Sequence, residues 1–139
     1  MKLDASLLVR GTDRRRGRTV WMSPRNSVLT YLTYARIRLD AKSRPVMLAS
    51  ATHETSLICM GGSGRLRIDG IDATLAPYDA VFIPRNARCA VATDSHVDFL
   101  EASAPTPRDA DPQIVRFADV RRSKDLTVDL RQPPFSRTI

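Results

Sequence analysis

The chain has 139 residues, of which 42% are apolar and 27% charged, and these are ordinary values for one globular domain with a hydrophobic core. No apolar run approaches the roughly 20 residues that cross a bilayer, and the apolar residues 7–9 are cut off by Arg10 before they could form a signal peptide. We therefore expect a cytoplasmic protein without a membrane partner. The two cysteines, Cys59 and Cys89, are expected to stay reduced in that compartment.

The net charge is +7, because 22 Lys and Arg residues outnumber 15 Asp and Glu residues. Nearly all of the cations are arginine, which binds carboxylates and phosphates through paired hydrogen bonds, so the excess points to anionic partners. A solvated basic surface is the simpler interpretation, and we favour it. Residues 1–18 end in a run of arginines but contain no aromatic residue to stack on a base, so we expect a mobile basic segment rather than a nucleic-acid-binding arm.

From residue 19 to residue 105 the sequence has the pattern of short β-strands separated by turns. Residues 30–39 are rich in β-branched and aromatic side chains, and within them Ile37 and Leu39 alternate with Arg36 and Arg38. Such alternation places apolar groups on one face of a strand and charged groups on the other. Two further strands are predicted at 45–50 and 55–60, after which a glycine-rich turn ends the run.

The clearest local signal is a predicted hairpin around Asp69-Gly70. The residues on either side, 65–68 and 71–75, alternate between polar and apolar, and Asp-Gly suits the positive φ angles of a tight primed turn. The next predicted strands are 80–83, 89–92 and 97–102. A spacing of about eight residues between turn-bounded strands is typical of a β-sandwich or barrel.

Residues 106–139 form a C-terminal extension that contains several prolines. We expect it to run over the surface of the domain, with edge strands at 113–117 and 126–130.

Around Glu54 the sequence resembles the first motif of the cupin family, because Glu54 is followed after six residues by Gly61. The family's metal-binding histidines closely precede that glutamate, at positions that here hold residues 47–50, Met-Leu-Ala-Ser. His53 is next to Glu54, but neighbours on a strand point to opposite faces, so both cannot enter one site. A catalytic metal takes about three protein ligands, and we therefore expect neither a metal nor another cofactor.

Residues 78–84 and the turn after them resemble the second cupin motif. Tyr78 stands where a glycine is usual, Asn86 takes the place of the motif glycine, and Cys89 takes the place of the motif histidine, which makes it a soft replacement ligand. The resemblance implies an all-β fold with a single cupin-type barrel, a jelly roll or double-stranded β-helix, formed by residues 19–105.

A longer resemblance, spread over roughly residues 6–139, narrows the family. Residues 53–64, the hairpin that follows, and residues 79–84 and 102–105 are similar in order to the N-terminal half of the bacterial 5-deoxy-glucuronate and 5-keto-4-deoxyuronate isomerases. Those enzymes have two cupin halves and carry their metal histidines in the C-terminal half. The resemblance implies a metal-free module that is structural or binds a small sugar acid. The alternative is one part of a split isomerase, of the kind used in inositol breakdown, completed by a separate C-terminal cupin subunit.

The candidate site residues come from the motifs and from the charge. Glu54 is expected to point into the barrel, either as the base of an aldose–ketose isomerisation or as a structural ion-pair partner. Cys89 is expected to face the same interior, as an inert thiol or as a substrate contact. Arg85, Arg88 and Arg36 are the candidates for binding the carboxylate of a sugar acid, although loop arginines are more often solvated.

Other residues are given structural roles. His53 and His96 are expected at the surface or in turns, because neither has a second histidine at metal-binding spacing. Trp21 is expected to pack as an anchor near the first strand. A homodimer formed through edge strands is expected as well. A regulatory or nucleic-acid-associated protein that uses residues 14–18 is the third functional hypothesis, ranked below the other two.

Overall fold

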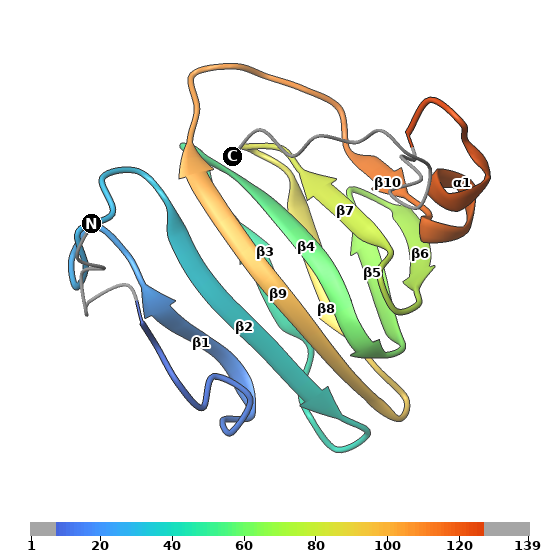
Figure 1. Cartoon of the computed structure of the whole chain (residues 1–139), viewed down its shortest axis with the longest axis horizontal. Helices are drawn as coiled ribbons and strands as arrows, with labels where there is room; N and C mark the ends of the chain where they lie inside the picture. The colour runs from blue at the N-terminus through green and yellow to red at the C-terminus, as the bar shows by residue number, and fades with distance from the viewer. Residues whose placement is uncertain (1–7, 127–139) are drawn as a thin grey trace, which may run out of the picture.

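The computed structural model describes residues 8–126, which form two facing antiparallel β-sheets (Figure 1). The strands of sheet A lie in the order β1 (Gly17–Met22), β2 (Thr33–Asp40), β9 (His96–Pro105), β4 (His53–Gly62), β7 (Ala80–Ile83) and β10 (Gln113–Val115). The strands of sheet B lie in the order β3 (Val46–Ala49), β8 (Arg88–Ala92), β5 (Gly64–Ile68) and β6 (Ile71–Leu75). A short helix, α1 (Phe117–Arg122), follows β10, and no helix in this part of the chain is long and apolar enough to span a bilayer. The predicted all-β fold is confirmed.

The strands predicted between residues 30 and 102 are present, with small shifts at their ends. They are preceded by β1, which begins at Gly17, inside the segment expected to be mobile. The edge strand predicted at 113–117 exists as β10 and pairs with β7, but Phe117 begins α1 instead. Most of the strand predicted at 126–130 lies outside the described residues.

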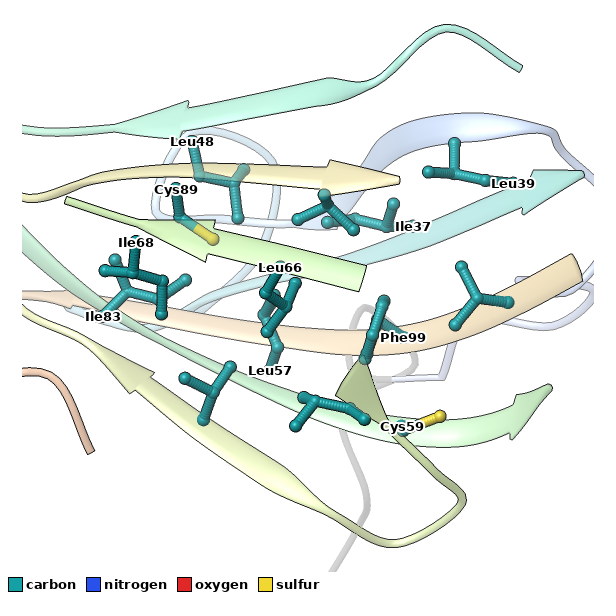
Figure 2. Close-up of a cluster of buried hydrophobic side chains, with 14 of the residues drawn as sticks. Ile37, Leu39, Leu48, Leu57, Cys59, Leu66, Ile68, Ile83, Cys89 and Phe99 are labelled. Atoms are coloured by element: carbon teal, nitrogen blue, oxygen red, sulfur yellow. The ribbon is translucent and has the colours of Figure 1, made fainter. Parts of the chain in front are cut away.

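The core lies between the two sheets and is filled by side chains that alternate along each strand (Figure 2). β2 buries Ala35, Ile37 and Leu39. It turns the two arginines between them, Arg36 and Arg38, to the outer face, as the sequence pattern predicts. Phe99 and Leu57 are fully buried on sheet A, and Leu66 faces them from sheet B. Burying one such side chain contributes about 1.5–3 kcal/mol, so this layer supplies much of the folding free energy.

Positive φ angles occur at three turns that the sequence singled out. Asp69 and Gly70 have φ angles of 46° and 90°, the pattern of a primed two-residue turn, and the predicted β5–β6 hairpin is confirmed. Tyr78 and Asn86, which stand at glycine positions of the cupin motif, have φ angles of 72° and 67°. The backbone thus keeps a left-handed conformation at both positions. Placing a residue other than glycine in that conformation costs about 1 kcal/mol at each position.

The described part of the C-terminal extension, residues 106–126, is held against sheet A by Asp79, which is 6% exposed. Its carboxylate accepts hydrogen bonds from the backbone N–H of Phe117 at 2.9 Å, from Arg116 at 3.0 Å and from the N–H of Ala76 at 3.1 Å. Burial alone would raise the pKa of Asp79, but these hydrogen bonds outweigh it and lower the pKa below its usual value. The rings of Tyr78 and Phe117, with centroids 5.2 Å apart, add an aromatic contact.

The close approach of the end of β4 to the start of β9 can be tested at Gly62. Gly62 has a φ of +75°, and a Cβ there would lie 2.2 Å from the backbone oxygen of His96, which accepts a hydrogen bond from the N–H of Ser63. We expect Gly62→Ala to lower the free energy of unfolding by about 3 kcal/mol through this clash and the backbone strain. Gly61→Ala meets nothing within 4 Å and should change it by less than about 0.5 kcal/mol. Urea denaturation measures both values, and equal losses would contradict the packing described.

Candidate functional site

The most buried charged side chain in the described part of the chain is Glu101 on β9, which is 1% exposed. Its two carboxylate oxygens accept hydrogen bonds from Nε and Nη2 of Arg18 on β1, each at 2.7 Å. These hydrogen bonds raise the pKa of Arg18 although burial opposes them, so the guanidinium stays charged. A buried carboxylate requires such a partner, because removing an ion from water costs several kcal/mol.

The register of sheet A explains how Arg18 reaches Glu101. β2 lies between β1 and β9, with Ile37 paired to Arg18 and Ala35 paired to Glu101. The Arg18 side chain therefore crosses the inner face of β2, and the small, fully buried Ala35 leaves room for it. One ion pair thus ties together two strands that are far apart in sequence and do not hydrogen-bond to each other.

The ion pair lines a pocket of about 320 Å³ between the two sheets, at the end where β9 stops and β4 starts (upper left in Figure 1). The pocket also receives four hydroxyl side chains and one imidazole, from Thr33, Ser50, Thr55, Ser103 and His53. Apolar side chains, among them those of Leu48 and Ile83, close it toward the core. A volume of this size accommodates a small polar molecule.

On β4 it is His53, and not Glu54, that enters this pocket. β4 buries Leu57 and Cys59, so the alternation of a strand places Thr55 and His53 on the same inner face and Glu54 on the outer face. The prediction that Glu54 points into the barrel is therefore wrong. His53, expected at the surface or in a turn, is half-buried at the start of β4 and lines this pocket.

The loop before β4 orients His53. Its backbone N–H donates to Oγ of Ser50 at 3.0 Å, and its Nδ1 lies 2.9 Å from Oγ1 of Thr52. Its Nε2 has no hydrogen-bond partner among residues 8–126. The other histidine, His96, is the exposed first residue of β9 and lies at the surface, as predicted.

The three arginines proposed from the sequence lie outside the pocket. Arg36 is on the outer face of β2, where it donates two hydrogen bonds of 2.7 Å to Asp98. Arg88 is exposed and points outward from β8. Arg85 follows β7, close to the pocket, but its Nε donates to Asp109 at 2.7 Å. Since none of the three lines the pocket, their role as carboxylate ligands stays a prediction.

Cys89 faces the interior, as expected, but lies in the core below the pocket. It is fully buried between β3 and β5, near Leu48 and Ile68 (Figure 2). Burial, with a smaller effect from the charge of Asp69, raises the pKa of the Cys89 thiol to about 12. Such a thiol is protonated at neutral pH and does not reach a ligand in the pocket. Cys59 is also buried, and both cysteines are free.

Thiol labelling tests this placement of Cys89, with Cys59→Ala used to leave it as the single cysteine. At pH 8 a thiol with a pKa of about 12 is about one part in 10,000 thiolate. Burial slows the reaction further, so we expect 5,5′-dithiobis(2-nitrobenzoic acid) to label the native protein at least about 100-fold more slowly than the urea-unfolded protein. Equal rates in the native and unfolded states would show that Cys89 is accessible.

The metal that serves many cupins does not fit these residues. The pocket offers His53 and Glu101 as ligand types, and Arg18 occupies both oxygens of the Glu101 carboxylate. Between residues 8 and 126 no three His, Cys, Asp or Glu side chains are grouped so that they could hold a metal ion. A catalytic metal takes about three protein ligands, which is more than this pocket offers.

A larger hollow, of about 490 Å³, lies on the outer face of sheet B. Its charged groups are paired at the surface, since Arg67 donates two hydrogen bonds of 2.9 Å to Asp72 and Arg65 donates to Asp94 at 2.7 Å. It contains no buried charge and no histidine. We therefore place the candidate site in the pocket beside Glu101.

Sequence reasoning missed both Arg18 and Glu101, although β9 contains a signal for the second. Val97, Phe99 and Glu101 occupy alternate positions of that strand, so its pattern places a carboxylate on the apolar face. A charge at such a position predicts a buried partner. The identity of that partner is not visible in the sequence, because composition alone assigns Arg18 to the basic N-terminal segment.

No protein-family model matches the sequence, and no curated protein matches it either. Solved structures do match. An IolB-like protein from Salmonella typhimurium aligns with a TM-score of 0.62 and 17% identity, over 73% of this chain and 42% of its own. A cupin protein from Bacteroides fragilis aligns with a TM-score of 0.60 and 20% identity, over 80% of this chain and 92% of its own. KdgF from Halomonas aligns with a TM-score of 0.51 and 18% identity, over 64% of this chain and 77% of its own.

The chain thus spans less than half of the Salmonella protein and nearly all of the Bacteroides protein. At identities of 20% and below, these likenesses establish the fold and leave the activity open. The two facing antiparallel sheets, the left-handed turns at the motif positions and these structural neighbours agree with one another. The described chain has the cupin fold.

Proposed function

We propose that this chain is a cupin domain that binds a small sugar acid in the pocket beside Glu101 and that is not an isomerase by itself. The observation that carries the proposal is the convergence of a guanidinium, an imidazole and four hydroxyl groups on one pocket of about 320 Å³. Hydroxyl side chains both donate to and accept from the hydroxyl groups of a sugar. A guanidinium suits the carboxylate of a sugar acid.

Arg18 is the group that binds this carboxylate. A guanidinium has five N–H donors, and Glu101 accepts from Nε and Nη2, which leaves Nη1 without a hydrogen bond to any residue between 8 and 126. The Arg18 side chain is 36% exposed, so a bound molecule can reach it. Because Glu101 already neutralises Arg18, we expect the carboxylate to bind weakly unless His53 and the hydroxyl groups also contact the sugar.

The same groups argue against isomerisation by this chain alone. Moving a proton between adjacent carbons requires a base and an electrophile that stabilises the developing charge. His53 supplies a base, but the nearby cation, Arg18, is already paired with Glu101. Glu54, the base suggested by the motif, lies on the outer face of β4.

Calorimetric titration tests the proposal with a matched pair of ligands, D-glucuronate and D-glucose. We expect saturable binding of glucuronate and at least about tenfold weaker binding of glucose, which lacks the carboxylate that Arg18 would bind. His53→Gln removes the imidazole and should weaken glucuronate binding about tenfold. Glu54→Gln, on the outer face of the same strand, should leave the affinity unchanged.

The opposite pattern, with Glu54→Gln weakening binding and His53→Gln leaving it intact, would overturn the placement of the site. Equal affinities for glucuronate and glucose would remove the role given to Arg18. Turnover of a uronate by the purified chain would contradict the conclusion that it is inactive alone.

A second candidate is one subunit of a two-part uronate isomerase, completed by a separate metal-binding cupin. The observation that favours it is coverage, since the chain aligns with 42% of the Salmonella protein. Turnover that needs both proteins, and that is absent with either alone, separates this candidate from the first. The homodimer expected from edge-strand pairing stays a prediction in both cases.

A further inference from the structure

Arginines without an ion-pair partner gather beside Trp21. Arg10, Arg14 and Arg15 are exposed, and they make no ion pair with any residue between 8 and 126. Together with Gly11 and Trp21 they line a pocket of about 290 Å³. This pocket is lined by other residues than the pocket beside Glu101, and the proposed sugar-acid site uses none of them.

The turn that presents these arginines is anchored to β2. Gly11 has a φ of +68° and its carbonyl accepts a hydrogen bond from the N–H of Arg14, which closes the turn. Nη1 of Arg36 donates to Oγ1 of Thr12 at 2.9 Å. Arg38 donates to the carbonyl of the next residue, Asp13. The turn is therefore held at two successive residues, which limits the entropy lost when a ligand binds to it.

Asp98 holds both of the anchoring arginines in place. Its carboxylate accepts two hydrogen bonds of 2.7 Å from Arg36 and lies 3.4 Å from Nε of Arg38. Asp13 is the single carboxylate of the segment from residue 8 to residue 16. Its charge acts on Arg36, after the stronger effect of Asp98. In the described part of the chain, no carboxylate forms an ion pair with any of the three pocket arginines.

Trp21 reaches this pocket from the outer face of β1. Since Arg18 faces inward toward Glu101, alternation places Thr19 and Trp21 on the outer face, where Thr19 pairs with Arg36. The pairing of β1 with β2 shifts between Val20 and Met22. The guanidinium carbon of Arg15 lies 5.4 Å from the centre of the Trp21 ring, within cation–π distance. The indole Nε1 is buried and has no hydrogen-bond partner among residues 8–126.

From this arrangement we propose that the pocket between Trp21 and the turn at residues 10–15 binds the phosphate group of a small phosphorylated molecule. The charged groups that line it are donors only, and guanidinium groups form paired hydrogen bonds with phosphate oxygens. A phosphate brings several acceptor oxygens and the negative charge that these arginines lack. The Trp21 ring provides an apolar surface for the rest of the molecule.

A small molecule fits these observations better than a nucleic-acid strand. Proteins that bind single strands combine a long basic groove with several aromatic side chains, each stacked on a base. This pocket has one aromatic residue and a volume of about 290 Å³. The carboxylates of Asp13, which is exposed, and of Asp40, which is half-buried and pairs with Arg16, lie on this side of the sheet and interrupt a continuous basic track.

Trp21 is the single tryptophan of the chain, so its fluorescence reports on this pocket directly. We expect saturable changes with inorganic phosphate and with glucose 6-phosphate at constant ionic strength, and none with glucose. Arg14→Gln and Arg15→Gln should each raise the dissociation constant for glucose 6-phosphate at least about tenfold, because each removes a charge-assisted contact. Arg88→Gln is the matched control, since Arg88 is also an exposed arginine but points outward from sheet B.

Each of the remaining outcomes overturns the proposal. No saturable change with either phosphate compound would show that the pocket binds no phosphate. An equal loss of affinity in Arg88→Gln would show that the overall charge, and not this pocket, attracts the ligand. Binding of a ten-residue oligothymidylate at concentrations 100-fold below those of glucose 6-phosphate would favour a nucleic-acid strand in place of a small molecule.

Discussion

The buried carboxylate of Glu101 constrains the rest of the structure, because a charge that is 1% exposed must meet a partner inside the fold. That partner, Arg18, lies on β1, the edge strand of sheet A. Detaching β1 would leave Glu101 buried and unpaired. Breaking a fully buried pair costs about 3–5 kcal/mol, and the cost here lies at the lower end of that range because water reaches part of the Arg18 side chain. β1 is thus attached to the domain by charge as well as by its hydrogen bonds to β2.

The same two strands build both the core and the candidate site. Along the inner face of β9 the apolar Phe99 is followed by Glu101 and Ser103, and on β4 the apolar Leu57 is followed, toward the same end, by Thr55. The change from apolar to polar comes one inward-facing position earlier on β9 than on β4, because Glu101 pairs with Leu57 and Ser103 pairs with Thr55. These residues mark the floor of the pocket. A dry, packed core below therefore supports a polar, solvent-accessible pocket above, without any additional element.

The strands and the Asp69-Gly70 hairpin could be predicted because side-chain alternation and turn chemistry are local properties of the sequence. The site could not be predicted in the same way, because Arg18 and Glu101 meet only through the order of strands in sheet A. The short cupin motif predicts the wrong face for Glu54, because the alternation of its own strand decides which way the side chain points. That alternation, read back from Leu57, puts the preceding odd-numbered residues inside and Glu54 outside.

A double-mutant cycle on Arg18 and Glu101 tests most directly the claim that this ion pair organises the fold and its pocket. Arg18→Met and Glu101→Met each retain side-chain volume while removing one charge, and urea denaturation gives the free energy of unfolding of each single variant and of the double variant. We expect each single change to cost about 3 kcal/mol and the double variant to be more stable than their sum predicts, with a coupling energy of about 2 kcal/mol. A coupling energy within about 0.5 kcal/mol of zero would contradict the account, because the two side chains would then act independently.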